Sequence, residues 1–392
     1  MLGIKKKMIK DKIRRVDIKA IMLFSLAWPI ATIKKRIQSE IWLLSERKGE
    51  ARDNGYWMFR YIKEKHPKQK TYYVIEKNSE DRKKIEKYGS VIDFGSFSHY
   101  VNYLAATKHV SAHVDSDSPN SRVSNFLETH GMLKNKRVFL QHGITKDKIS
   151  FGYYNVSRAD LFVCAARPEY EFCKKEFGYP SGAVQLLGFA RFDGLGVKTP
   201  KRQILLMPTW RAWLSNIKNE DFKKSDYYKQ YVALLNDEKL YEILDKYDTD
   251  LVFFPHSDMQ KYIHLFENEN NRIIIASAKK QDVQQLLNES QILITDYSSV
   301  AFDMAYMKKA ILYYQFDYNE YRKGQHPEGY FSYYEDGFGP VVDKKDDIIT
   351  WIDEKCKNNY VMDNKYLQRR NNFFAFMDKK NCSRIYSAIR EL

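Results

Sequence analysis

The sequence predicts two α/β domains in tandem, each built on a parallel sheet with helices on both faces. Short apolar runs alternate with helical stretches, a pattern typical of βαβ units, and the pattern repeats in the second half of the chain. The segment 194–203 (GLGVKTPKRQ) separates the two series, because it has Gly, Pro and charges but no apolar run. A chain of 392 residues also exceeds one ordinary core and fits two domains of roughly 150–200 residues.

The expected elements follow from these apolar runs. In the first half, strands are expected at 41–45, 71–75, 91–94, 109–114, 137–141, 161–165 and 184–187. In the second half, they are expected at 204–207, 251–254, 272–275, 292–295 and 310–314. Helices are expected at 56–65, 97–106, 231–246, 283–287 and from residue 300. We expect an N-terminal segment at 1–38, a first domain at 39–195 and a second at 196–392, whose helical end (about 363–392) packs back across the first domain.

The N-terminal segment combines basic clusters with an apolar stretch. Residues 1–20 carry eight basic and two acidic residues. The apolar stretch 21–33 (IMLFSLAWPIATI) is shorter than the about 20 residues that a transmembrane helix needs. The one-sided charge favours an amphipathic segment in the interface of an anionic membrane leaflet. The alternative is an ordinary core helix with a basic collar, and we expect no signal peptide because no small-residue cleavage site follows.

The overall charge indicates an anionic partner. The formal net charge is +15, which suits nucleic acid, anionic lipid or a phosphate-rich substrate. The basic residues lack the interleaved aromatics of a nucleic-acid platform, so no nucleic-acid partner is expected. Cysteines form neither a CxxC pair nor a zinc pattern, so reduced thiols and no structural zinc are expected. They are Cys164, Cys173, Cys356 and Cys382.

Two histidines follow expected strands, one in each half. His142 comes after the strand 137–141 and precedes Gly143, and His256 comes after the strand 251–254. A histidine held at a strand end has a pKa near neutrality and suits general-base work on a hydroxyl, as we expect for His142. His256 suits hydrogen bonding to a diphosphate. The alternative for each is a structural histidine in a loop.

A polar turn, 295–299 (TDYSS), lies between an expected strand and an expected helix. It places the hydroxyls of Ser298 and Ser299 and free backbone N–H groups at a helix N-terminus, which suits phosphate binding. Asp296 belongs to the same turn. Asp303, four residues after Ser299, is placed to accept hydrogen bonds from ribose hydroxyls. The alternatives are plain N-capping by the serines and a solvated surface acid.

Two arginines lie near the domain boundary, each after a strand. Arg191 precedes Asp193 by two residues, and Arg211 follows Thr209 by two. Each guanidinium can neutralise phosphate oxygens through a charge-assisted fork, and the alternative is a surface salt bridge. The sequence has no GxxxxGK[ST], GxGxxG after a strand, GxSxG or HExxH, and we discount 115–117 (DSD) as a metal holder. We therefore expect Ser, His, Arg and a helix dipole to stabilise a leaving group without an obligatory metal or cofactor.

The strand-end motifs occur in a fixed order over roughly residues 40–345. They are Asp53-Asn54; His142-Gly143; Phe177-Gly178-Tyr179-Pro180; Gly188 with Arg191-Phe192-Asp193; Pro208-Thr209-Trp210-Arg211; Pro255-His256; Asp296-Tyr297-Ser298-Ser299 with Phe302-Asp303; and 337–342 (GFGPVV). In this order and spacing they resemble the CDP-glycerol glycerophosphotransferase family of teichoic acid and capsule polymer synthesis. Two positions depart from the family pattern: Gln141 stands where many members have Trp, and Ala190 where many have Pro before the Arg.

The resemblance implies a glycosyltransferase-B-like fold of two Rossmann-like domains and attachment to the cytoplasmic face of the membrane. It implies that His142 is the base toward the acceptor hydroxyl, and that His256, Ser298 and Ser299 bind the donor diphosphate. We further assign Asp296, Asp303, Thr209 and Arg211 to the donor. Arg191, Asp193 and Gly143 are assigned to phosphate or acceptor.

The sequence thus predicts an enzyme that transfers glycerol phosphate or ribitol phosphate from CDP-glycerol or CDP-ribitol to an undecaprenyl-linked cell-envelope acceptor, with release of CMP. One alternative is a nucleotide-sugar glycosyltransferase of the same fold. Another, of a different class, is a basic, non-catalytic polyanion-binding protein, which predicts salt-dependent binding without turnover.

Overall fold

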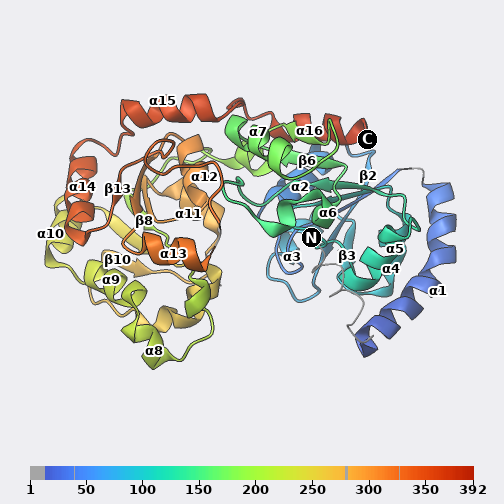
Figure 1. The fold of residues 1–392 in the computed structure, drawn as a ribbon, viewed down its shortest axis with the longest axis horizontal. Helices are drawn as coiled ribbons and strands as arrows, with labels where there is room; N and C mark the ends of the chain where they lie inside the picture. The colour runs from blue at the N-terminus through green and yellow to red at the C-terminus, as the bar shows by residue number, and fades with distance from the viewer. Residues whose placement is uncertain (1–13, 39, 279–280, 326) are drawn as a thin grey trace.

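The protein folds into two α/β domains that lie side by side (Figure 1). The computed structural model describes residues 14–38, 40–278, 281–325 and 327–392. Each domain is built on one sheet in which every strand pairing is parallel. The apolar strand residues are buried, as expected for sheets covered on both faces. The fold class predicted from the sequence is confirmed.

The first sheet has the strand order β3-β2-β1-β4-β5-β6-β7. Its strands are β1 (Ile41–Ser45), β2 (Lys70–Ile75), β3 (Val91–Asp93), β4 (Lys108–Ser111), β5 (Lys136–Phe139), β6 (Leu161–Cys164) and β7 (Val184–Leu186). The connections contain α2 (Asn54–Lys65), α3 (Arg82–Glu86), α4 (Phe97–Ala105), α5 (Ser121–Thr129), η1 (Ser150–Gly152), α6 (Tyr154–Ser157), α7 (Arg167–Glu176) and, after β7, η2 (Ala190–Gly194). The strand order reverses between β1 and β4, the point where ligands bind in such sheets.

The second sheet repeats this arrangement in the order β10-β9-β8-β11-β12-β13. Its strands are β8 (Gln203–Leu206), β9 (Asp250–Phe253), β10 (Ile273–Ile275), β11 (Ile292–Thr295), β12 (Ala310–Tyr314) and β13 (Val341–Val342). The helical elements are η3 (Ala212–Leu214), α8 (Asn219–Lys224), α9 (Asp226–Leu235), α10 (Glu238–Lys246), η4 (Ser257–Leu265), α11 (Val283–Glu289), α12 (Val300–Tyr306), α13 (Tyr318–Gly324) and α14 (Lys345–Lys357). Here the order reverses between β8 and β11.

The C-terminal segment connects the two domains. After α14, the chain forms α15 (Asn364–Phe373) and α16 (Asn381–Arg390), which run back across one side of the molecule to the first domain (Figure 1). There the Tyr386 ring stacks on His66 with centroids 3.7 Å apart and contacts Trp42 of β1 at 5.2 Å. The oxygens of Asp193 accept hydrogen bonds from the backbone N–H groups of Asn381 and Cys382, at the start of α16. The last helix thereby ties the second domain to the first.

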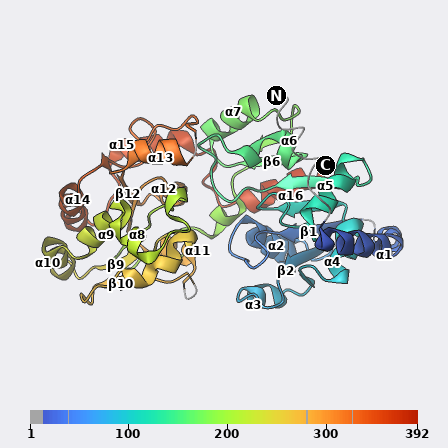
Figure 2. The same ribbon diagram turned by 60° about the horizontal axis from the view of Figure 1, so that its bottom comes forward.

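The N-terminal helix α1 (Arg15–Ile37) lies on the outside of the first domain, against α4 and α5 (Figures 1 and 2). Its packed face is formed by Ala20, Phe24, Ala27 and Ala31, and Phe24 contacts Tyr100 at 4.8 Å. Many of its other apolar side chains are exposed: Val16, Ile18, Ile21, Met22, Leu26, Ile30, Ile33 and Ile37. The helix is therefore apolar on its solvent side as well as on its packed side, unlike the amphipathic segment that we expected.

The length of α1 also differs from the expectation. The apolar stretch 21–33 was predicted to be too short to cross a bilayer, but the helix extends through the flanking basic residues to 23 residues. Among the described residues, α1 is the one helix whose length and composition would allow it to span a membrane. Residues 1–13, which hold part of the basic cluster, lie outside the described residues.

Three further expectations need correction. The single helix predicted at 231–246 is two helices, because Asp237 accepts hydrogen bonds from the N–H groups of Lys239 and Leu240 and starts α10 anew. The strand predicted at 109–114 ends at Ser111, since the loop that follows turns through a left-handed Asp115 (φ 59°). The strand β13 was not predicted, because two residues form no recognisable apolar run.

Candidate functional site

The strand-end loops of the two domains meet at a place that we call the domain junction, defined by His142, Gly143, Arg191, Ser299 and Asp303. His142 and Gly143 follow β5, and Ser299 and Asp303 follow β11. A Cβ atom added to Gly143 would lie 2.8 Å from Ser299 Oγ, a separation that packed atoms avoid. Glycine at 143 is therefore what allows the serine turn of the second domain to approach the histidine loop of the first.

The backbone before His142 is held in an unusual conformation. Gln141 has φ 59°, in the left-handed region that a residue with a side chain rarely adopts. Its buried amide donates to the Val163 carbonyl (2.6 Å), and its amide oxygen accepts from the Thr145 hydroxyl (2.6 Å). Asn54 at the start of α2 donates to the Gln141 carbonyl (2.7 Å). Such conformations persist only when the surroundings fix them, and they cluster at functional sites.

The imidazole of His142 is enclosed by aromatic rings. The ring of His113 stacks on it with centroids 4.3 Å apart and an interplanar angle of 7°, and the Phe151 ring lies 5.7 Å away. Burial lowers the pKa of His142 from its ordinary value, and this effect outweighs the charge of Asp53, which acts in the opposite direction. Nδ1 of His142 has no hydrogen-bond partner within the described part of the chain. The ring is thus neutral near pH 7, as a general base requires.

Arg191 bridges the domains. Its Nε and Nη2 donate to the two carboxylate oxygens of Asp303 (2.8 and 2.9 Å), and its Nη1 donates to Asp53 (2.9 Å) and to the His142 carbonyl (3.0 Å). In this structure the charged groups of Arg191 and Asp303 pair with each other, and their roles in phosphate and ribose binding stay predictions. Their contacts fix the donor-side helix α12 against the His142 loop.

The Asp193 carboxylate makes contacts that the sequence did not predict. Its Oδ1 accepts from the side-chain and backbone N–H groups of Asn381, and its Oδ2 accepts from the backbone of Cys382. The carboxylate is therefore engaged in anchoring α16, and its role as a phosphate or acceptor ligand stays a prediction.

Arg211 and Asp296 form a buried ion pair beneath the serine turn. The Arg211 guanidinium is fully buried and lies 2.9 Å from Asp296, and it also donates to Asp317 (2.6 Å). Burial alone would lower the pKa of Arg211, but the charges of Asp296 and Asp317 outweigh it and raise the pKa well above its usual range. Asp296 in turn accepts from the Thr209 N–H (2.8 Å). Since both side chains are enclosed, they support the turn in this structure, and their contact with the donor stays a prediction.

The remaining donor-side residues are accessible or have free hydrogen-bonding groups. Ser298 and Ser299 are partly exposed, and the Ser298 hydroxyl is only weakly engaged, by the Val300 N–H at 3.4 Å. The Thr209 hydroxyl is buried and has no partner among the residues described. His256 follows β9, its side chain is 30% exposed, and its Nδ1 lies 3.2 Å from Asp258. Burial lowers the pKa of His256, as it does for His142.

Sequence reasoning missed two residues at the domain junction. His113, stacked on His142, was placed inside an expected strand. Arg47, two residues after β1, has an exposed side chain that lies 3.7 Å from Glu50, and its charge lowers the pKa of His113, His142 and His256. The rule that polar residues at strand ends mark the site would have found both, had β1 and β4 been searched as β5 and β11 were.

Two Rossmann-like domains joined at their strand ends define a glycosyltransferase-B-like architecture. More particularly, the chain belongs to the CDP-Glycerol:Poly(glycerophosphate) glycerophosphotransferase family, which matches it over residues 27–391. Within the described residues, no group of three or more His, Cys, Asp or Glu side chains is arranged to hold a metal ion.

Known relatives agree with this assignment. The chain is 36% identical over 396 residues to the minor teichoic acid biosynthesis protein GgaB of Bacillus subtilis (strain 168). The aligned region covers 98% of this chain and 43% of GgaB. It is 23% identical over 314 residues to a teichoic acid poly(glycerol phosphate) polymerase of Staphylococcus epidermidis, covering 74% of this chain and 42% of the relative. The chain thus spans less than half the length of these two curated relatives.

Solved structures share the fold. The wall teichoic acid polymerase TagF, as its H548A variant, superposes with a TM-score of 0.70 at 18% identity, covering 95% of both chains. A UDP-GlcNAc 2-epimerase of Methanocaldococcus jannaschii superposes with a TM-score of 0.53 at 13% identity, covering 90% of this chain and 100% of that one. At these identities the likeness concerns the fold alone.

Proposed function

We propose that this protein transfers glycerol phosphate or ribitol phosphate from a CDP-alditol to a hydroxyl group of a lipid-linked cell-envelope acceptor. The observation that carries the proposal is the contact between Gly143 and Ser299, because it brings the His142 loop of one domain against the serine turn of the other. A base and a set of phosphate-binding hydroxyls on opposite domains are what a transfer between two substrates needs. Membership of the family supports the donor class.

In the proposed reaction, the acceptor hydroxyl oxygen attacks the β-phosphorus of the donor. His142 takes the hydroxyl proton, a bond forms between this oxygen and phosphorus, and the bond from phosphorus to the bridging oxygen breaks. CMP leaves with that oxygen and its electron pair. Ser298, Ser299 and His256 donate hydrogen bonds to the diphosphate as its negative charge shifts, and prepositioning supplies much of the rate. We expect these protein groups to suffice, without an obligatory metal or cofactor.

The donor assignment is tested by replacing the two serines. Ser298→Ala with Ser299→Ala is expected to weaken CDP-glycerol binding by about a hundredfold or more, because two hydrogen bonds to charged oxygens are lost, each about 1.5–3 kcal/mol. Calorimetric titration measures this directly. Ser332→Ala with Ser387→Ala, outside the domain junction, is the matched control. Unchanged affinity in the Ser298/Ser299 variant would remove these residues from the donor site, and binding of UDP-sugars but not CDP-alditols would favour the sugar-transferase alternative.

We also propose that α1 rests on the anionic cytoplasmic face of the membrane. Its exposed apolar residues include Met22, Leu26 and Ile33, and basic residues occupy both ends of the helix: Arg15, Lys19, Lys34, Lys35 and Arg36. Because the opposite face is packed on α4, a helix lying in the interface keeps its contacts with the domain, whereas one crossing the bilayer would lose them. This placement would hold the protein at the membrane that carries a lipid-linked acceptor.

The membrane proposal predicts a loss of vesicle binding on adding charge to this face. Met22→Glu with Leu26→Glu and Ile33→Glu is expected to reduce binding to phosphatidylglycerol-containing vesicles by more than about tenfold. Val197→Glu with Tyr334→Glu and Val361→Glu changes the charge equally at other exposed apolar positions and should bind as the wild type does. Equal binding of all three proteins in a sedimentation assay would contradict the proposal.

A further inference from the structure

His113 and His142 follow the neighbouring strands β4 and β5 of the first sheet, and β4 is one of the two strands between which the strand order reverses. His113 lies two residues after β4, and His142 lies three residues after β5. Their rings are nearly parallel, at 7°, with centroids 4.3 Å apart. The Nδ1 atoms of both rings are buried without a hydrogen-bond partner among the described residues. Hydrogen bonding at Nδ1 therefore does not orient either ring. Stacking joins the two rings, and His142 is also held by a hydrogen bond to the backbone of Ala112 and by contact with Phe151.

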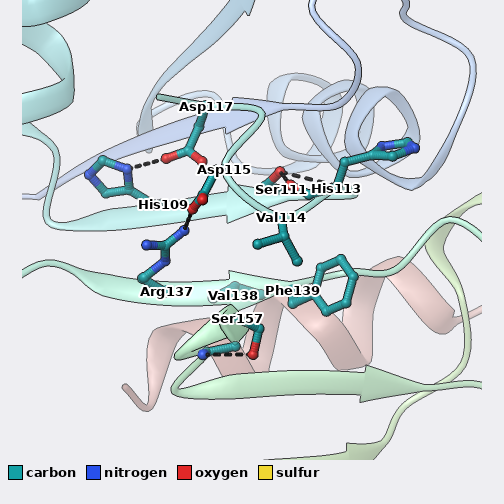
Figure 3. A pocket seen from close by; sticks show the side chains of 11 residues that line it. His109, Ser111, His113, Val114, Asp115, Asp117, Arg137, Val138, Phe139 and Ser157 are labelled. Carbon is teal, nitrogen blue, oxygen red and sulfur yellow. Dashed lines mark hydrogen bonds and ion pairs between the residues drawn. The ribbon is translucent and has the colours of Figure 1, made fainter. Parts of the chain in front are cut away.

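Polar contacts of its own residues fix the loop that carries His113. The Ser111 hydroxyl accepts from the His113 N–H (3.2 Å) and hydrogen-bonds to Ser116 (2.6 Å). Further along, Asp115 pairs with Arg137 (2.6 Å), and Asp117 hydrogen-bonds to His109. Figure 3 shows His109, Ser111, Asp115, Asp117 and Arg137 around a small pocket, with the His113 imidazole directed away from these side chains. The polar cluster explains how the loop holds a fixed shape, and the imidazole is left free to cover His142.

We propose that His113 is a positioning residue, which stacks on the imidazole of His142, holds its orientation and keeps water from one face of the ring. This inference rests on the proposed function, in which His142 is the base. For this role, residue 113 needs a flat, neutral ring that can stack on the imidazole of His142. The proposal assigns no proton transfer to His113 itself.

The charges around the pair are consistent with a neutral stack. Burial, the neighbouring His142 and Arg47 lower the pKa of His113 to about 2. For His142, burial is opposed by Asp53 from the loop before α2 and by a hydrogen bond to the backbone of Ala112, and it is reinforced by Arg47 and Arg191. Two stacked imidazoles cannot both carry a charge without repulsion, so the neighbour adds to the factors that keep the base unprotonated.

The test compares His113→Ala, which removes the ring, with His113→Phe, which keeps a flat ring that cannot titrate. His130→Ala, at an exposed histidine at the end of α5, is the control. We expect His113→Ala to lower kcat by about tenfold or more with little change in KM for the donor, since loose positioning of a catalytic group affects the chemical step. We expect His113→Phe to retain kcat within about threefold.

A second readout does not depend on turnover. The imidazole resonances of His142, assigned by their loss in His142→Gln, can be titrated by NMR. In His113→Ala the pKa of His142 is expected to rise toward the ordinary histidine value, because water reaches the ring, while in His113→Phe it stays where the wild type has it. If wild type shows no transfer with any CDP-alditol, the proposed function fails, but the NMR titration still decides whether His113 controls His142.

Two outcomes would overturn the inference. In the first, His113→Ala leaves both kcat and the His142 titration unchanged. In the second, His113→Phe loses as much activity as His113→Ala, which would assign the role to the ring nitrogens of His113 instead of to stacking. A His113→Ala protein that does not fold leaves His113→Phe to decide, because that variant must keep both activity and the wild-type titration.

Discussion

Replacing His142 with alanine is expected to lower kcat for alditol-phosphate transfer by about 10²–10⁴-fold, the range that a general base supplies. The affinity for CDP-glycerol should change little, because the donor-binding groups lie on the other domain. His130→Ala, which removes an exposed histidine, should behave as wild type. Initial rates of CMP release, with donor affinity measured separately by calorimetry, check both parts. Full activity of His142→Ala would defeat the assignment of the base.

The pH dependence follows from the same residue. A base works when it is unprotonated, so kcat/KM falls as the pH drops through the pKa of His142 in the free enzyme. Burial holds that pKa below its ordinary value, so the acidic limb of the profile should lie below about pH 6.5. An acidic limb above this value would show that another group, or an uncovered His142, controls the rate.

Replacing Arg211 with methionine is expected to destabilise the second domain by about 3–5 kcal/mol, since it leaves Asp296 and Asp317 buried without their cation. Methionine approximates the length of the side chain, so the loss reports the charge more than the packing. Arg272→Met is the matched control, because Arg272 pairs with Asp245, Asp248 and Asp250 at the surface, where water and salt screen the ion pairs. Chemical unfolding, followed by intrinsic fluorescence, measures the free energy of unfolding of both variants.

A stability change for Arg211→Met no larger than that of Arg272→Met would contradict the structural role given to Arg211. So would a variant that unfolds as wild type does but has lost donor binding alone, because that pattern belongs to a residue in contact with the donor. The structure predicts that stability and donor binding fail together, since Asp296 also holds the backbone of Thr209 beside the serine turn.

The architecture could be predicted because buried parallel strands leave strong signals in sequence. The apolar runs at 41–45, 292–295 and 310–314 coincide with β1, β11 and β12. Where the sequence signal was local and weak, the element or its boundary was not predicted correctly. The two residues of β13 form no pattern, and the break between α9 and α10 depends on a single capping aspartate, Asp237.

The site could be predicted by place but not always by role. His142, Gly143 and Ser299 meet at the domain junction because strand ends of parallel sheets converge. The partners of Arg191 could not be known, since Asp303 lies 112 residues away in sequence and only the fold brings it within 2.8 Å. The sequence around a strand-end arginine does not show whether the arginine pairs with a carboxylate of the protein or binds a phosphate of a ligand. Exposure separates the two cases, and exposure belongs to the tertiary structure.

Transfer of an alditol phosphate from a CDP-activated donor releases CMP, so an assay of CMP release tests the proposed function. CDP-glycerol and CDP-ribitol are incubated in parallel with the protein and a membrane lipid acceptor, beside His142→Ala and the Ser298/Ser299 double variant. We expect the wild-type protein to release CMP from one of the two donors, and we expect this release to be greatly reduced in both variants. No release from either donor, together with no binding of CDP, would contradict it and would favour a nucleotide-sugar donor.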